Sequence, residues 1–204
     1  MGNTTGFSRP SRALFALILV AVATPIAASE CPDLDSISFD STAHAFTQER
    51  TLKSLPNPLI SKGILQIRED SFVWQVCAPF DIRTVIDATG VSQSIEGGPA
   101  TSPGAGAVQD AIQKINIADI FRGRFDRLAN AFTLSSPTDR VRGEPWRVTL
   151  TPQPGAIATV IARIDVSGCQ AIDQVAISYR DGGQDQIMVG AAVPEATNAQ
   201  CPAE

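Results

Sequence analysis

The chain has 204 residues, with 16 Lys and Arg against 21 Asp and Glu, a formal net charge of −5 and an isoelectric point near 4.9. Such an acidic protein repels phosphate backbones and anionic membrane surfaces, so nucleic acid is not an expected partner. The length and the 44% of hydrophobic residues suit one domain with a real core.

Residues 1–29 have the pattern of a cleavable secretion signal. Arg9 and Arg12 precede an apolar run over residues 13–23, and no acidic residue occurs among the first twelve. The run is shorter than the ~20 residues that span a bilayer, and Pro25 follows it closely, so a permanent membrane anchor is not favoured. We therefore expect export of a soluble single domain over residues 30–204.

The cleavage site is predicted from small residues at its two key positions. Ala27 and Ser29 fit the −3 and −1 positions, with Ala28 as an alternative end. Cys31 follows the charged Glu30 and not a small residue, unlike the cysteine of a lipoprotein signal. We expect no lipid anchor on this chain.

The mature chain begins with a weakly helical stretch over residues 34–45, and then alternates in the manner of strands. Alternation of apolar and polar residues separated by turn residues predicts a meander. Its expected strands are 46–52, 60–68, 72–77, 82–88 and 91–95.

A loop rich in Gly and Pro over residues 97–106 leads into the clearest helical period of the chain. Its apolar face carries Val108, Ile112, Ile115 and Ile120. A short second helix is predicted over residues 116–123, ended by Gly123.

A second set of strands completes the chain. The expected strands are 131–135, 146–151, 157–166, 172–179 and 186–192, and Asp181-Gly182-Gly183 marks a hairpin between the last two. Short connections make all neighbours antiparallel. The pattern predicts a mainly β fold with some α: a strongly curved antiparallel sheet or incomplete barrel whose open side is covered by helices.

The four cysteines predict disulfides, because an exported chain meets an oxidising compartment. Four thiols allow three pairings, of which we favour Cys31 with Cys201 and Cys77 with Cys169. Metal binding is the competing use, but the cysteines lie far apart and His44 is the only histidine. We expect no metal site.

Catalytic and cofactor motifs are missing from the sequence. His44 has no G-x-S-x-G elbow to accompany it, and Gly104-Ala105-Gly106 lacks a third glycine and a surrounding βαβ unit. Scattered carboxylates such as Asp87 and Asp185 fall at turns or on polar strand faces, where acids are ordinarily just solvated. We expect neither an enzyme nor a cofactor.

An ordered set of short motifs resembles the LolA-type carriers of outer-membrane lipoproteins in the Gram-negative periplasm. The set comprises Phe46-Thr47-Gln48, Gly63 with Leu65, Arg68 followed by Phe72 and Trp74, Pro79 before a strand that ends at Gly90, and Trp146, Val148, Leu150 and Pro152 in a W-x-V-x-L-x-P strand. Departures from the family include the four cysteines and residues 91–95, which lack an aromatic side chain.

The resemblance implies an unclosed antiparallel β-barrel (a half-barrel) with a helical lid and an apolar cavity. In the family an arginine at the position of Arg68 holds the lid shut, and a phenylalanine at the position of Phe72 helps to retain cargo. A guanidinium offers five donors and keeps its charge, so it suits the latch. The alternative is that Arg68 faces water beside Glu69 and Asp70.

The candidate ligand-binding residues are those expected on the apolar face or in the lid. They are Arg68, Phe72, Trp74, Val85, Ile112, Ile115, Ile120, Phe121, Phe132, Trp146 and Val148. The resemblance implies a monomeric periplasmic carrier that shields lipoprotein acyl chains between an inner-membrane exporter and an outer-membrane acceptor. The alternatives are a carrier of a glycolipid or another envelope lipid, and a module that senses lipid or binds a protein during envelope assembly.

Overall fold

The computed structural model describes residues 1–2, 30–34, 37, 43–102, 117–137, 141, 143–193 and 201. Most of the predicted signal peptide lies outside these residues, and so do Ile112 and Ile115 of the predicted lid. The division into a signal and one domain stays a prediction. Among the helices of the described residues, none is long and apolar enough to cross a membrane.

Ten strands form one antiparallel sheet. Its strands are β1 (Ala43–Thr51), β2 (Leu59–Ile67), β3 (Ser71–Ala78), β4 (Ile82–Asp87), β5 (Gly90–Ile95), β6 (Phe132–Ser135), β7 (Trp146–Pro152), β8 (Ile161–Gly168), β9 (Ile172–Tyr179) and β10 (Gln184–Val193). The order across the sheet is β5-β4-β3-β2-β1-β10-β9-β8-β7-β6. Two meanders therefore join where β1 pairs with β10.

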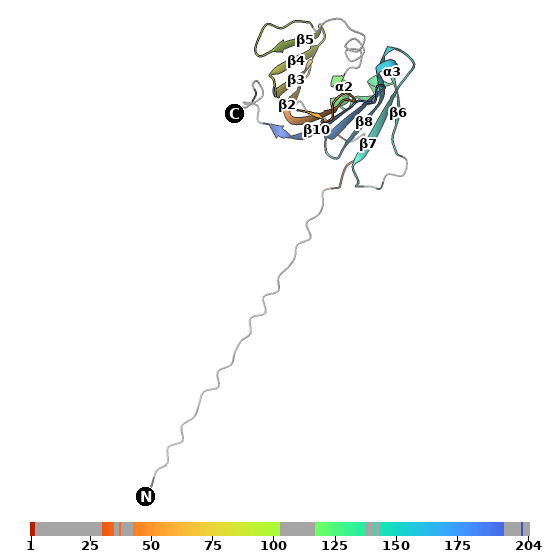
Figure 1. Cartoon of the computed structure of the whole chain (residues 1–204). Helices are drawn as coiled ribbons and strands as arrows, with labels where there is room; N and C mark the ends of the chain where they lie inside the picture. The colour runs from red at the N-terminus through yellow and green to blue at the C-terminus, as the bar shows by residue number, and fades with distance from the viewer. Residues whose placement is uncertain are drawn as a thin grey trace.

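The sheet is curved and unclosed, which confirms the expected half-barrel. Its outermost strands are β5 and β6, which do not pair with each other. Figure 1 shows the sheet bending so that the arm of β3, β4 and β5 faces the arm of β6, β7 and β8. We call the hollow side of this bend the concave face, and the opposite side the convex face.

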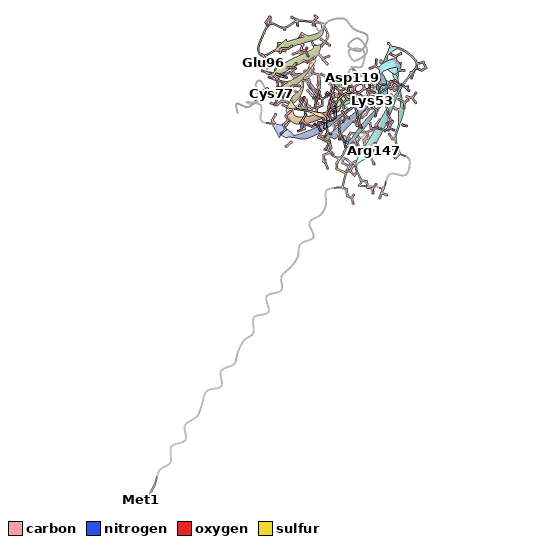
Figure 2. The ribbon with its side chains drawn as sticks, in the orientation of Figure 1. Met1, Lys53, Cys77, Glu96, Asp119 and Arg147 are labelled. Carbon is pink, nitrogen blue, oxygen red and sulfur yellow. A yellow bond between two sulfur atoms is a disulfide. The ribbon has the colours of Figure 1, made fainter. Side chains whose placement is uncertain are left out.

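The helical segments of the described residues include α2 (Ile117–Phe121), the 3₁₀ helix η2 (Phe125–Leu128) and α3 (Ala156–Val160). Figure 2 places Asp119 of α2 between the arm that carries Glu96 and the arm that carries Arg147. Ile120 and Phe121 are buried, and they belong to the same core cluster as Phe72 on one arm and Trp146 on the other. The helix thus fills part of the concave face.

The short helix predicted over residues 116–123 is confirmed as α2. Its last turn is closed by hydrogen bonds from Gly123 N to Ile120 O and from Arg124 N to Asp119 O, at 3.0 and 2.8 Å. Gly123 has a φ of 67°, a left-handed conformation that glycine adopts without a steric penalty. An ion pair of 2.6 Å between Arg124 and Asp119 also joins the helix to the turn after it.

Two predicted boundaries are wrong. The strand expected over residues 157–166 begins only at Ile161, because residues 156–160 form α3 and lie beyond Leu150 and Ile164, the last pair between β7 and β8. The weak helix expected over residues 34–45 does not include residues 43–45, because these belong to β1 and pair with β2. In both cases the neighbouring strand decides where pairing is possible.

The predicted disulfide pairing is also wrong, since the bridges are Cys31–Cys169 and Cys77–Cys201. The backbone of Cys31 pairs with Gly143, just before β7. Cys169 directly follows β8, the neighbour of β7, so these two cysteines meet. Cys77 lies on β3, and β2, β1, β10 and β9 separate that strand from β8.

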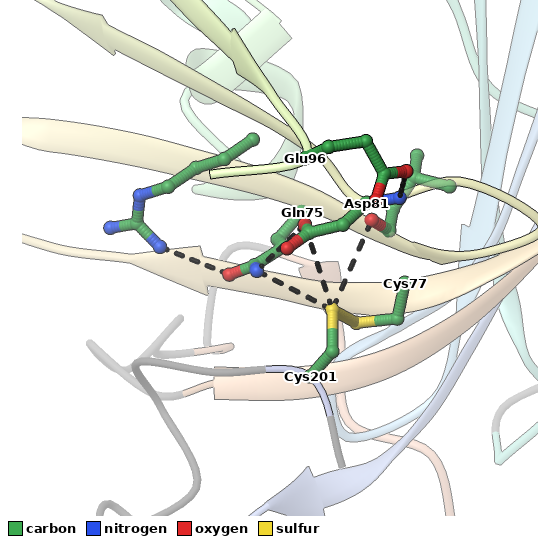
Figure 3. Close-up of a disulfide and its surroundings, with 7 residues drawn as sticks. Gln75, Cys77, Asp81, Glu96 and Cys201 are labelled. Carbon is green, nitrogen blue, oxygen red and sulfur yellow. Dashed lines mark hydrogen bonds between the residues drawn. A yellow bond between two sulfur atoms is a disulfide. The ribbon is translucent and has the colours of Figure 1, made fainter. Parts of the chain in front are cut away.

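The bridge from Cys77 holds Cys201 against the convex face of β3. Gln75, two residues before Cys77, is buried and donates hydrogen bonds to Asp81 Oδ1 and to Cys201 Sγ, at 3.1 and 3.4 Å. Figure 3 shows Cys201 beside Gln75 and Asp81. The C-terminal cysteine is therefore part of the packing of this arm and not of the N-terminal segment.

Candidate functional site

A cavity of about 360 Å³ opens on the concave face between the sheet and α2. Most of its lining is aliphatic or aromatic, and a smaller part is polar. The lining residues are Gln48, Arg50, Phe72, Trp74, Val76, Ile82, Thr84, Ile86, Gln93, Ile120, Ile161, Ile164, Ile177, Tyr179, Asp185 and Ile187. The volume falls within the range of roughly 300–1,000 Å³ that is typical of small-molecule sites.

Strand alternation produces the apolar wall. Along β3, Phe72, Trp74 and Val76 point to the concave face, because successive residues of a strand face opposite sides. Their partners on β4 are Ile86, Thr84 and Ile82 in the same order, so the two strands present one continuous surface.

Four aromatic rings connect this wall to the helix. Phe46 and Trp74 have ring centroids 4.2 Å apart, and Phe121 of α2 lies 5.4 Å from Phe72 and 5.8 Å from Trp74. Such tilted and offset ring pairs each stabilise by about 0.5–1.5 kcal/mol beyond the area that they bury. We expect these contacts to hold α2 against the sheet.

Apart from Arg68, the predicted binding residues that the structure describes divide into three groups. Phe72, Trp74 and Ile120 line the cavity. Four others are buried in the core and do not line it: Phe121, Phe132, Trp146 and Val148. Val85 pairs with Val73, between the cavity-lining Thr84 and Ile86, and so it lies on the convex face.

Hydrogen bonds between the helix and the sheet come from Arg122, on the helical side, and not from the side chain of Arg68. Arg122, the residue after α2, donates from Nη2 to the carbonyl oxygens of Arg68 and Ser71, at 2.6 and 3.0 Å. Arg68 N also donates to Ser71 O, so Arg122 binds the β2–β3 turn itself. The exposed side chain of Arg68 donates to Gln66 Oε1 at 2.8 Å.

A charged cluster occupies one part of the cavity wall, far in sequence from the predicted site. Asp185 of β10 is buried and accepts hydrogen bonds from Arg50 Nε and Nη2, both at 2.6 Å, from Gln48 Nε2 at 3.1 Å and from Tyr179 Oη at 2.9 Å. The hydrogen bond to Asp185 raises the pKa of Arg50. Sequence analysis missed this cluster, although Gln48 and Arg50 follow Phe46 at the two-residue spacing of one strand face.

Tyr179 offers a direct test of this cluster, because it is the only tyrosine of the chain. Burial raises its pKa above the ordinary value of 10.0, and the nearby Asp185 charge raises it further. We expect near-ultraviolet absorbance titration of the native protein to show Tyr179 still protonated where free tyrosine is half ionised.

Stability should follow the same titration. An unfolded chain releases the tyrosine proton near pH ~10 while the native state retains it, so the stabilisation is complete below that pH and is lost as pH rises above it. Chemical-denaturation curves of Tyr179→Phe should show a smaller fall in the free energy of unfolding at alkaline pH than those of the wild type. Half ionisation of Tyr179 near its ordinary value with the fold intact would contradict the expected burial.

A second hollow, of about 620 Å³, lies where η2 approaches β6 and the chain around Leu34 and Ile37. Arg122 and Arg124 line it together with Ser135 and Ser136. It lacks the continuous apolar wall that β3 and β4 give to the first cavity, so the first is the better candidate for an apolar ligand.

Comparison with solved structures finds similarity of fold at low sequence identity. The structure is similar to a LolA superfamily protein from Nitrosomonas europaea, with a TM-score of 0.42, 6% identity and coverage of 79% of this chain and 91% of that one. It is also similar to a domain from Vibrio parahaemolyticus described as an outer membrane lipoprotein-sorting protein, with a TM-score of 0.30, 10% identity and coverage of 81% and 93%. No family model and no curated protein matches the chain.

Proposed function

We propose that the protein is a periplasmic carrier that holds the acyl chains of lipoproteins in the half-barrel cavity and shields them from water between two membranes. The observation that carries the proposal is the open apolar wall of β3 and β4, with Trp74 and Ile120 facing the same cavity. A compact core would have filled this space with side chains.

The energetics of lipid in water support a need for such a cavity. Each methylene that leaves water gains about 0.8 kcal/mol, so a sixteen-carbon chain gains on the order of 12 kcal/mol. A lipidated protein therefore does not leave its membrane unaided. A carrier has to offer comparable apolar surface, and then release the chain to an acceptor.

The position of Arg122 suggests how loading is controlled. Its hydrogen bonds to the β2–β3 turn tie the end of α2 to the arm that carries the cavity wall. Opening the cavity breaks two polar contacts, and a bound acyl chain compensates by contact with Trp74 and Ile120. In this proposal the exporter and the acceptor act on the closed and open forms of α2, and the carrier works as a monomer.

Trp74 provides the signal for a binding test, since the chain has two tryptophans and only Trp74 lines the cavity. A peptide carrying a brominated sixteen-carbon acyl chain should quench Trp74 fluorescence with one-to-one stoichiometry. The same peptide without the acyl chain should not. In Trp74→Phe the quenching should be lost while binding, followed by native mass spectrometry, persists.

Two valines on neighbouring strands form a matched pair of variants. Val76→Phe places a ring in the cavity, whereas Val85→Phe places it on the convex face. A ring that displaces two methylenes of the ligand should weaken binding by about tenfold, at ~0.8 kcal/mol for each. Val85→Phe should bind like wild type. Equal affinities of the two variants, or no binding by the wild type, would exclude the carrier proposal.

A further inference from the structure

The cavity wall contains two charged side chains, Arg50 and Asp185, that a container for acyl chains alone does not need. Asp185, with its side chain 3% exposed, is buried beside aliphatic residues, and its two oxygens accept four hydrogen bonds. Moving a carboxylate from water into such a place costs several kcal/mol, and well-packed hydrophobic residues often replace a buried ion pair without loss of stability. The cluster therefore suggests a role in binding.

The exposed member of the cluster is Arg50. Its side chain is 45% exposed although its partner is almost fully buried. A guanidinium has two edges that can each bind an oxyanion with two hydrogen bonds. Asp185 occupies the edge formed by Nε and Nη2, at 2.6 Å for both contacts. The other edge is the one formed by the two Nη groups.

Arg50 is held in place by its neighbours and does not need to be ordered by a ligand. Gln48 and Tyr179 bind the same carboxylate, at 3.1 and 2.9 Å, so Asp185 is fixed from three sides. A guanidinium that is already oriented loses less side-chain entropy when it binds an anion. Such a site favours planar or tetrahedral oxyanions over neutral groups.

The register of the sheet places this charge next to the apolar wall. Arg50 pairs with Asp185, Asp185 pairs with Ile177, and Ile177 pairs with Ile164, all on the concave face. The aromatic wall around Trp74 and the helix residue Ile120 line the same cavity. A ligand with an anion directly attached to an acyl chain can therefore contact both regions at once.

We propose that Arg50, positioned by Asp185, binds the phosphate or carboxylate of an amphiphile whose acyl chain lies against Trp74 and Ile120. This inference rests on the proposed carrier function and adds a preference to it. Acyl ligands with an oxyanion near the chain bind more tightly than neutral ligands of the same chain length. An arginine–oxyanion contact of this kind is expected to favour them by about tenfold.

The test compares three sixteen-carbon ligands below their micelle concentrations: lysophosphatidylglycerol, the free fatty acid and the monoacylglycerol. Each displaces a neutral fluorescent probe from the purified protein. Wild type should bind one or both of the anionic ligands about tenfold more tightly than the monoacylglycerol, and the stronger of the two identifies the oxyanion. The preference should shrink as salt increases, because Arg50 is partly exposed.

Three variants assign the preference to Arg50. Arg50→Lys keeps a cation beside Asp185 but lacks the planar edge, so the preference should fall severalfold. Arg50→Gln combined with Asp185→Asn removes both charges without leaving one buried and unpaired, and the preference should disappear because affinity for the anionic ligands falls more than affinity for the monoacylglycerol. Arg163→Lys, at a surface ion pair with Asp165 on β8, is the control and should behave like wild type.

The outcomes separate this inference from the carrier function. If wild type binds all three ligands equally, or the double variant keeps the preference, the role of Arg50 is wrong and the carrier proposal stands. If none of the three ligands displaces the probe, both proposals fail. Should the double variant not fold, Arg50→Lys and the salt dependence of the wild type decide the question.

Discussion

Replacing Cys77 and Cys201 together by serine should lower the free energy of unfolding by about 5 kcal/mol. In the loop-entropy model a closed loop of about 100 residues contributes about 4.7 kcal/mol, and this bridge joins residues 124 positions apart. Domains of this size are usually stable by only ~5–15 kcal/mol, so the loss is a large fraction of the total. Denaturant unfolding at equilibrium measures it, and Cys31→Ser with Cys169→Ser should show a loss of similar size.

Thiol counting on the same variants checks the connectivity. Cys77→Ser with Cys201→Ser should leave no reactive thiol in the denatured oxidised protein, because Cys31 and Cys169 remain bridged. The mismatched variant Cys31→Ser with Cys201→Ser should expose two, from Cys77 and Cys169. Two thiols in the first variant and none in the second would instead support the pairing expected from the sequence, Cys31 with Cys201 and Cys77 with Cys169.

Arg122→Gln should free α2 from the β2–β3 turn without unfolding the sheet. A hydrogen bond from a charged donor contributes about 1.5–3 kcal/mol, so loss of the contacts to Arg68 O and Ser71 O should raise the open population by about 10- to 100-fold. Burial lowers the pKa of Arg122, and the positive charge of Arg124 lowers it further. The cost of desolvating Arg122 therefore reduces the net stabilisation that its hydrogen bonds provide. We place the expected value at the lower end of that range.

Hydrogen exchange at the end of α2 measures this opening. The amides of Gly123 and Arg124 donate to Ile120 O and Asp119 O, and they should exchange faster in the variant. Arg127→Gln, at an exposed residue of η2, is the matched control and should exchange like wild type. A bound acyl ligand should also leave the Arg122→Gln protein faster. Unchanged exchange and unchanged ligand release would show that Arg122 does not fasten the helix.

We propose that the cavity and the hydrogen bonds of Arg122 act together. Phe121 stacks on Phe72 while Arg122, the next residue, binds the turn that precedes Phe72. The burial of apolar surface is not directional, so a lipid chain can replace much of this contact, whereas the hydrogen bonds of Arg122 depend on geometry. Ligand entry is therefore expected to disturb the rings first and the arginine second.

Local patterns were sufficient to predict most of the strands. Residues 72–77 alternate between apolar side chains of one face and smaller or polar ones of the other, and β9 begins and ends at the predicted residues. The helical turn ended by Gly123 was likewise predictable, because a left-handed glycine is a local signal. The starts of β1 and β8 were not, because they depend on which residues the neighbouring strands can pair with.

The alternation of β4 was visible in the sequence, but the sequence did not show which set of alternate residues faces the cavity. Ile82, Thr84 and Ile86 face the cavity, and Val85 faces the other side. A period of two residues defines two faces, and only the pairing with β3 decides which of them is concave. The candidate list therefore contained Val85 and omitted Ile82 and Ile86.

The sequence by itself determined an acidic chain of antiparallel strands with a short helix, because alternation, turns and charge are properties of neighbouring residues. Only the tertiary structure decided which cysteines bond, that Arg122 is the arginine between helix and sheet, and that Arg50 meets Asp185 across 135 residues of sequence. These contacts join distant segments, and the order of the strands brings those segments together. No local pattern encodes that order. A strand can pair with any sheet edge in a register that keeps its hydrophobic side chains facing the core.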